Sequence, residues 1–138
     1  MIPVLVLTHG DLANGLLNAA RIIDPHLDQA TSALALPWDV DSDEASSTVR
    51  QLLEDLDQGQ GVLVLTDMFG GTATNLALPF LVPDYIEIIT GVNLPMLVKL
   101  GSLREHGLAM HELATRLTDA GQKSIRVASE FLRSKRTG

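Results

Sequence analysis

The chain contains no cysteine, few aromatic residues and fewer basic than acidic residues. The absence of cysteine excludes disulfide bonds, thiol nucleophiles and thiolate metal sites. The net charge of −7 argues against a nucleic-acid partner, because proteins that bind nucleic acid present a basic face. It favours a soluble ligand or a protein partner with a basic patch. No apolar run approaches the roughly 20 residues that a bilayer requires, and we see no signal peptide, so we expect a cytoplasmic protein.

What the chain does contain is a high proportion of aliphatic side chains. Its 138 residues are 46% hydrophobic but only 4% aromatic, which is too apolar for a disordered chain. This length suits one domain with a single sizeable core. We therefore expect a single domain over residues 1–138.

Several short segments have the composition of β-strands. Ile2–Thr8 and Gly61–Asp67 are apolar on both faces, which is typical of central strands in a parallel sheet. Weaker patterns predict strands at Thr31–Leu36 and Tyr85–Thr90, and a final edge strand at Ser124–Ala128. The two central strands are each followed at once by a turn.

Helical spacing of apolar residues predicts helices between and after these strands. They are expected at Asp11–Ile23 with Asp11 as N-cap, at Asp43–Asp57, at Thr72–Leu81, after Pro95, and at Leu108–Ala120. The alternation of strands and helices predicts an α/β fold class, a doubly wound and mostly parallel sheet with helices on both faces.

In such sheets the functional site lies beyond the carboxyl ends of the strands. That rule selects three loops, 8–11, 66–72 and 90–95, which are also rich in glycine and small polar residues. We expect the site to be built from these loops.

The first two loops carry residues suited to phosphoryl transfer. His9 is a candidate nucleophile, and Asp67, at the end of the other central strand, can orient its ring and stabilise the charge that develops on it. Gly70, Gly71 and Thr72 open a helix and can present backbone amides to an anion, while the Thr72 hydroxyl can cap that helix or contact an oxyanion. Each feature has a simpler structural explanation, such as a helix cap or a tight turn. Together they favour a phosphohistidine intermediate.

Other features of the sequence contribute less to the functional hypothesis. No nucleotide-binding fingerprint or metal-ligand spacing is present, so we expect no cofactor and no metal. Trp38 either lines a partner surface or covers the core, and the sequence leaves both readings open. The basic residues Arg133, Lys135 and Arg136 are expected to form a frayed, solubilising tail.

The motifs, in order, resemble one protein family. They are VLTHG at 6–10, LANGLLNAA at 12–20, GVLVLTDMFGGT at 61–72 with Asn75, and GVNLPML at 91–97. This combination is similar to the IIA component of the mannose family of the bacterial phosphoenolpyruvate-dependent sugar phosphotransferase system (PTS), and it spans nearly the whole chain.

The resemblance implies a phosphocarrier. In that family the carrier protein HPr, itself phosphorylated by enzyme I, passes its phosphoryl group to the histidine that corresponds to His9, at Nε2. Asp67 corresponds to the orienting aspartate. The phosphate- or partner-binding residues are expected among Gly10, Met68, Phe69, Gly70, Gly71 and Thr72. A IIB protein then accepts the group on the way to a sugar. The family also implies an antiparallel edge strand and a homodimer, sometimes with that strand exchanged.

The chain departs from the family pattern in places. Thr72-Ala73 stands where Ser-Pro is usual, which keeps the hydroxyl but loses a rigid element, and Asp11 adds a negative charge near His9. No IIB sequence follows, so the chain could serve a separate IIB protein or act as a regulatory module controlled by phosphorylation of His9. A dihydroxyacetone kinase phosphoryl donor and a hydrolase are less favoured alternatives, the latter because no nucleophile motif is present.

Overall fold

The computed structural model describes residues 1–137, apart from the side chains of Asp28, Arg136 and Thr137. It is an α/β structure whose strands and helices alternate along most of the chain. The strands are β1 (Val4–His9), β2 (Thr31–Leu36), β3 (Val62–Thr66) and β4 (Ile86–Thr90). The helices are α1 (Leu12–Ile23), α2 (Ser42–Leu56), α3 (Thr72–Ala77), α4 (Leu94–Arg104), α5 (Met110–Lys123) and α6 (Ala128–Thr137), with short 3-10 turns at Pro25–Asp28 and Leu78–Phe80.

All four strands form one parallel sheet in the order β2-β1-β3-β4. The chain passes from β1 outward to β2 and then returns to β3 on the other side of β1. The strand order therefore reverses between β1 and β3, which is where a crevice forms in open α/β sheets. Leu7 of β1 pairs in register with Thr66 of β3, so their carboxyl ends lie side by side.

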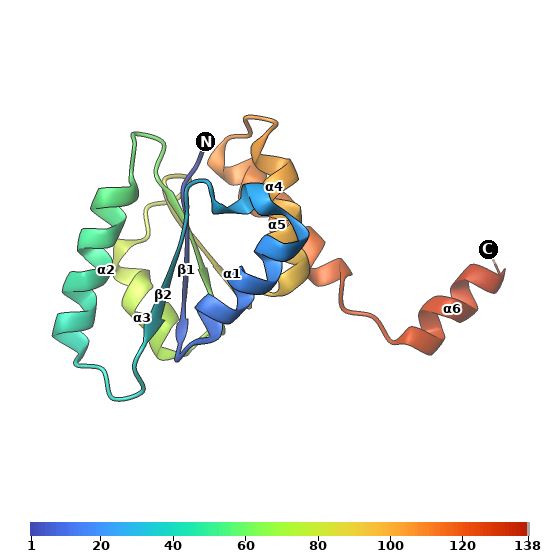
Figure 1. Cartoon of the computed structure of the whole chain (residues 1–138), viewed down its shortest axis with the longest axis horizontal. Helices are drawn as coiled ribbons and strands as arrows, with labels where there is room; N and C mark the ends of the chain where they lie inside the picture. Colours follow the sequence, from blue (N-terminus) through green and yellow to red (C-terminus); the bar gives the residue numbers. More distant parts are fainter. Residues whose placement is uncertain (138) are drawn as a thin grey trace.

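Helices cover both faces of the sheet, as expected. Figure 1 shows α2 and α3 on one side and α1, α4 and α5 on the other. Alternate residues of the central strands supply both cores. Val4, Val6, Leu63 and Leu65 pack toward α1, α4 and α5, whereas Leu5, Leu7, Val62 and Val64 pack toward α2 and α3. This two-sided burial explains why both strands read as continuous apolar runs.

The expected C-terminal edge strand is absent from the described residues. Helix α5 ends at Lys123 with Ser124 as its C-cap, the next three residues form no strand, and α6 then begins at Ala128. Ile125 and Val127 are 79% and 60% exposed, so their apolar side chains pack on neither core. A short alternating segment becomes a strand only when it finds a partner edge, and here the chain leads away from the body instead (Figure 1). The basic tail predicted to be frayed is part of helix α6.

The predicted N-cap of α1 also differs. Asp11 occupies the N-cap position, but its φ of −83° and ψ of 7° are not the extended conformation of a capping residue, and its side chain makes no capping hydrogen bond. The hydroxyl of Thr8 accepts from the backbone N–H of Ala13 at 2.7 Å in its place. The helix that follows the first loop is thus capped from within β1.

Gly61 sets the entry into β3, and its replacement should destabilise the fold. Gly61 has a φ of +81°, and a Cβ there would lie 1.9 Å from the carbonyl oxygen of Tyr85, which accepts the N–H of Val62. We expect Gly61→Ala to lower the free energy of unfolding by about 3 kcal/mol, because strain and displacement of β4 act together. Gly59→Ala is the matched control: its φ is +96° but no atom lies within 4 Å, so only the strain of about 1 kcal/mol remains. Urea unfolding of both variants measures the difference, and equal losses would contradict this account.

Within the described residues, no helix is long and apolar enough to cross a membrane.

Candidate active site

His9 and Asp67 meet at the point where the strand order reverses. His9 is the last residue of β1 and Asp67 directly follows β3, so the sheet itself brings them together from 58 positions apart in the chain. Their side chains are largely buried, at 16% and 11% exposure respectively. The pair expected from the sequence is therefore assembled at the expected edge of the sheet.

Hydrogen bonds at both ring nitrogens determine the protonation pattern of His9. Nδ1 lies 2.6 Å from Oδ2 of Asp67, and the backbone N–H of Thr72 donates to Nε2 at 3.1 Å. An amide N–H needs a lone pair on its acceptor, and a carboxylate accepts hydrogen bonds only. In the neutral ring the proton therefore lies on Nδ1, and the Nε2 lone pair points toward Thr72. Nε2 is the nitrogen available as a nucleophile.

Asp67 is held in its ionised form by its surroundings. Burial by itself raises the pKa of this carboxyl, but hydrogen bonds from the His9 backbone and ring, the charge of the ring, and the Met68 N–H together lower the pKa below its ordinary value. Oδ2 accepts both the backbone N–H of His9, at 2.9 Å, and its Nδ1–H, while Oδ1 accepts the N–H of Met68 at 3.0 Å. A carboxylate with this set of donors can stabilise a positive charge on the ring.

Two buried threonines hold the loop between β3 and α3, and the sequence analysis did not identify them. Thr74 donates its hydroxyl hydrogen to the carbonyl oxygen of Met68 at 2.6 Å, and its oxygen lies 2.7 Å from that of Thr66. Both side chains are fully buried. A threonine on the buried face of α3, beside Ala73 and Ala77, was the available signal. Their contacts fix the turn that places the Thr72 N–H against His9.

Gly71 is required for the close approach of this turn to the ring. A Cβ at Gly71 would lie 2.8 Å from Cε1 of His9 and 2.9 Å from Cγ of Met68. We expect Gly71→Ala to displace the ring, lengthen the bond from Thr72 to Nε2 and slow any reaction at Nε2 about tenfold. Gly15→Ala in α1 is the control, because a Cβ there meets nothing within 4 Å. Single-turnover modification of His9 measures the effect; an unchanged rate for Gly71→Ala would exclude this role of the glycine.

The remaining predicted site residues take different places. Thr72 is the first residue of α3 and Gly71 its N-cap, so Thr72 acts through its backbone and does not cap the helix. Gly10 and Gly70 have φ values of +51° and +80° and shape the two turns. Met68 and Phe69 are 55% and 77% exposed. They lie beside the site, available to a partner.

The third loop supports the fold. The side chain of Asn93 accepts the N–H of Met96 at 3.1 Å, which caps α4, and donates to the carbonyl oxygen of Gly121 at 3.1 Å. These bonds tie α4 to α5. Among the described residues, none of the hydrogen bonds that we resolve joins this loop to His9 or Asp67.

Trp38, whose role the sequence left open, lies over the ring of His9. The two rings are stacked, with centroids 5.2 Å apart and planes 20° from parallel. The indole is nevertheless 82% exposed, so it does not cover the core. Leu12, Met68 and Phe69 follow His9 or Asp67 within three residues of the chain and are exposed as well, and we call these four side chains the apolar rim.

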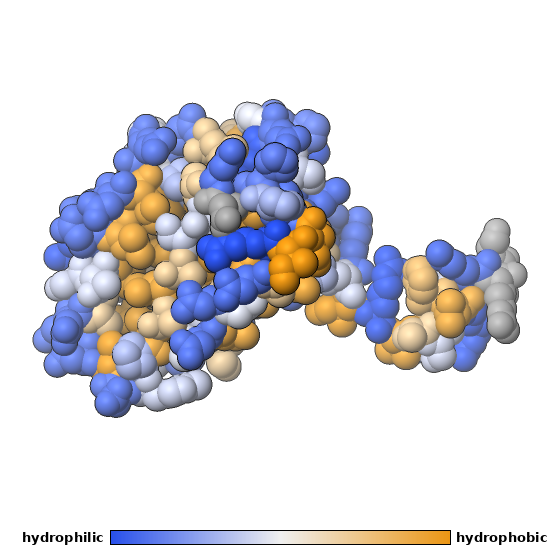
Figure 2. All heavy atoms as spheres, in the orientation of Figure 1, coloured by the Kyte–Doolittle hydropathy of each residue, from blue (hydrophilic) through white to orange (hydrophobic). Residues whose placement is uncertain are grey.

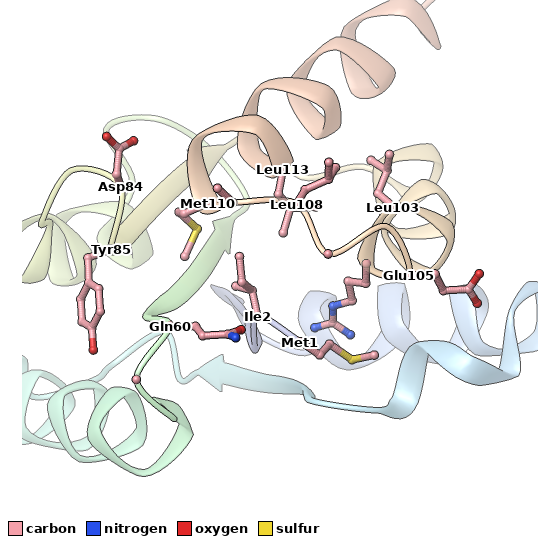
Figure 3. A pocket seen from close by; sticks show the side chains of 14 residues that line it. Met1, Ile2, Gln60, Asp84, Tyr85, Leu103, Glu105, Leu108, Met110 and Leu113 are labelled. Carbon is pink, nitrogen blue, oxygen red and sulfur yellow. The ribbon is translucent and has the colours of Figure 1, made fainter.

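A cavity lies at the other end of the molecule. It has a volume of about 560 Å³ and is lined by residues that precede the strands, including Ile2, Gln60 and Tyr85, and by Met110 and Leu113 of α5. Figure 3 shows these side chains around it. Because His9 and Asp67 lie at the carboxyl ends of the strands, the cavity is separate from the candidate active site.

Across the part of the chain that is described, no three His, Asp or Glu side chains come close enough to hold a metal ion.

Comparison with known proteins gives a consistent result. Residues 3–118 match the family model described as PTS system fructose IIA component. The chain is 34% identical to the PTS system fructose-specific EIIA component of Bacillus subtilis, over 99% of this chain and 93% of that protein. It is 28% identical to the PTS system mannose-specific EIIAB component of Escherichia coli, covering 91% of this chain and 39% of that longer protein.

Solved structures show the same fold. The phosphotransferase system component EIIA from Streptococcus agalactiae superposes with a TM-score of 0.83 at 21% identity, over 94% of this chain and 99% of that one. The PTS IIA protein associated with the fucose utilization operon of Streptococcus pneumoniae superposes with a TM-score of 0.80 at 30% identity, over 94% and 95%.

Proposed function

Because the chain belongs to the fructose and mannose IIA family of the phosphotransferase system, we propose that it carries a phosphoryl group on Nε2 of His9. The group comes from phosphorylated HPr and passes to a IIB protein. Family membership itself places the chain in phosphoryl transfer linked to sugar uptake. The observation that supports the finer statement is the hydrogen bonding of the ring: Nδ1 toward Asp67 and the Nε2 lone pair toward Thr72.

The transfer step follows from that arrangement. Nε2 attacks the phosphorus, the Nε2–P bond forms, and the P–N bond to the donor histidine breaks, with its electron pair leaving on the donor ring. The Nδ1 proton stays on His9, so the ring becomes positively charged and Asp67 balances it. The Thr72 N–H loses its acceptor when Nε2 bonds to phosphorus and becomes free to donate to a phosphoryl oxygen. The reverse sequence delivers the group to the IIB protein.

The apolar rim suits a protein donor. Leu12, Trp38, Met68 and Phe69 are exposed around His9 and offer a docking surface next to the reacting atom. A phosphocarrier must also release the group again, so strong binding of the phosphoryl group would work against its function.

The experiment is phosphoryl transfer from labelled phosphoenolpyruvate through enzyme I and HPr. The expected result is stoichiometric label that is acid-labile and base-stable, located at His9 by peptide mapping and chased by a IIB protein. Absence of label on the wild-type chain would overturn the phosphocarrier function and favour a regulatory binding module. If a IIB protein cannot remove the label, transfer from HPr to His9 is supported and transfer from His9 to the IIB protein is rejected.

A homodimer forms part of the proposal. The arm after α5 exposes apolar side chains, Ile125, Val127 and Leu132, and Figure 2 shows apolar groups on it away from the body. Among the described strands, β4 pairs only with β3, and beyond the antiparallel bridge between Ile86 and Val82 its outer edge is unpaired. A second copy could cover both features. Light scattering at micromolar concentration should give the mass of a dimer, and a monomeric mass would refute it.

A further inference from the structure

The tryptophan over His9 is the only one in the chain, and the fold places it there. Trp38 lies two residues after β2, and β2 is the neighbour of β1, with Leu36 in register with His9. The carboxyl end of β2 thus delivers the indole to the carboxyl end of β1. Its ring stacks on the imidazole at 5.2 Å between centroids. Because the indole remains 82% exposed, burial in the core does not explain its position.

The backbone around His9 accommodates this stack. A Cβ at Gly10 would lie 3.3 Å from Nε1 of Trp38, so the small residue there leaves room for the indole. Gly71 also approaches the imidazole closely, since a Cβ there would lie 2.8 Å from Cε1 of His9. The ring is therefore restrained by the indole on one face in addition to its in-plane hydrogen bonds.

Phosphorylation changes which of these contacts remain. The bond from Thr72 to Nε2 uses the lone pair that the phosphorus atom takes, so that bond cannot exist in the phosphorylated state. The hydrogen bond to Asp67 and the stack on Trp38 do not use that lone pair. The stack then becomes the main restraint on the ring beside Asp67.

The charge of the ring changes as well. A neutral imidazole becomes a cationic one when Nε2 bonds to phosphorus and Nδ1 keeps its proton. An indole face attracts a cation within about 6 Å of its centroid, more strongly than the faces of tyrosine or phenylalanine. The contact with Trp38 is consequently stronger in the phosphorylated state than before it, and it shifts the equilibrium toward that state.

We infer that Trp38 is a positioning residue that stabilises phosphorylated His9 through the stacked face of its indole. The inference rests on the proposed phosphocarrier function and adds a determinant of how strongly this chain holds the phosphoryl group relative to its donor. Trp38 makes no contact with the transferred group in this role; it acts through the His9 ring.

The test is the equilibrium partition of labelled phosphoryl groups between HPr and this chain. Trp38→Ala should lower the fraction on this chain, with a decrease of about 3- to 10-fold in the equilibrium constant. Trp38→Phe keeps an aromatic face and should recover most of the loss. Phe69→Ala is the matched control: its side chain is 77% exposed on the same rim, and the only ring that we find stacked on His9 in the described chain is that of Trp38.

The control separates stacking from docking. Phe69→Ala should raise the KM for phosphorylated HPr without changing the equilibrium constant. Docking affects the rate of transfer, whereas the equilibrium constant depends only on the free energies of the separate proteins with and without the phosphoryl group. If Trp38→Ala likewise raises only the KM, the inference is overturned and Trp38 is a docking residue. If the wild-type chain accepts no label at all, the proposed function fails and this inference fails with it.

A second measurement needs no phosphoryl transfer. In the proton NMR spectrum of the unphosphorylated protein, the indole should move the His9 ring signals upfield, and Trp38→Ala should abolish that displacement while Phe69→Ala preserves it. Ring signals of His9 that are the same in the wild type and in Trp38→Ala would show that the stack is absent in solution and would overturn the inference, whatever the transfer assay gives.

Discussion

His9→Asn is expected to abolish labelling of this chain by phosphorylated HPr. Asparagine retains a side-chain N–H that can donate to Asp67, so the buried carboxylate keeps a partner, but it has no nitrogen equivalent to Nε2. The nucleophile is thereby removed with little disturbance of its surroundings. In the wild-type protein, Oδ2 of Asp67 accepts hydrogen bonds from Nδ1 of His9 at 2.6 Å and from the backbone N–H of His9 at 2.9 Å. Label should fall to background in a single-turnover assay.

His26→Asn serves as the control for this variant. His26 belongs to the turn after α1, at the amino ends of the strands, where its backbone N–H donates to Asp24 at 3.0 Å. Removal of this imidazole should leave labelling at the wild-type level. Residual acid-labile label on His9→Asn would place the phosphoryl group on another histidine and refute the assignment of the nucleophile.

Asp67→Asn should reduce the rate of phosphoryl acceptance by about 10²- to 10⁴-fold. The carboxylate stabilises the positive ring that forms when Nε2 bonds to phosphorus, and a neutral amide cannot do so. The amide also changes the hydrogen bonding of the ring. If its nitrogen faces Nδ1, the ring proton moves to Nε2, where it opposes the N–H of Thr72 and occupies the nucleophilic lone pair.

The same substitution has a cost in stability. Both oxygens of Asp67 accept backbone N–H groups, from His9 and from Met68. Either orientation of an amide sets one N–H against another. We expect the free energy of unfolding to fall by about 1–3 kcal/mol, so rates should be compared at a temperature where the variant is folded.

Asp11→Asn controls for the loss of one negative charge near His9. Asp11 lies in the loop 8–11 that contains His9, is exposed, and makes no capping hydrogen bond. Its neutralisation should change the rate of acceptance by less than about threefold, since an exposed charge is screened by solvent. Equal losses in Asp67→Asn and Asp11→Asn would attribute the effect to overall charge and reject the orienting role of Asp67.

The sheet and the pair at its edge could be predicted from the sequence because local patterns carried the information. Val4–Leu7 and Val62–Leu65 are apolar at every position, which is typical of strands covered on both faces. Once two parallel central strands are expected, their carboxyl ends must lie together, and the polar residues that follow them, His9 and Asp67, form the candidate site. Short-range periodicity and one topological rule were sufficient.

The C-terminal segment could not be predicted in the same way. The residues after Ser124 alternate weakly, and whether such a segment becomes a strand depends on an edge to pair with, which is a property of the whole fold or of a second copy. In the chain as described, Ile125 and Val127 remain exposed and a helix follows. The cap of α1 is a similar case: Asp11 has the right side chain, but the backbone at that position has the wrong conformation, and Thr8 caps the helix instead.

By itself, then, the sequence determined which residues follow the central strands and which chemistry they can perform. The tertiary structure decided how that chemistry is set up: the Thr72 N–H on Nε2, the Gly71 backbone against the ring, and the indole of Trp38 over its face. These contacts join residues 29 to 63 positions apart, and hydrogen-bond direction and ring stacking depend on distances of a few tenths of an ångström. Such geometry has no periodic signature along the chain, because it arises only when the strands, loops and helices are packed together.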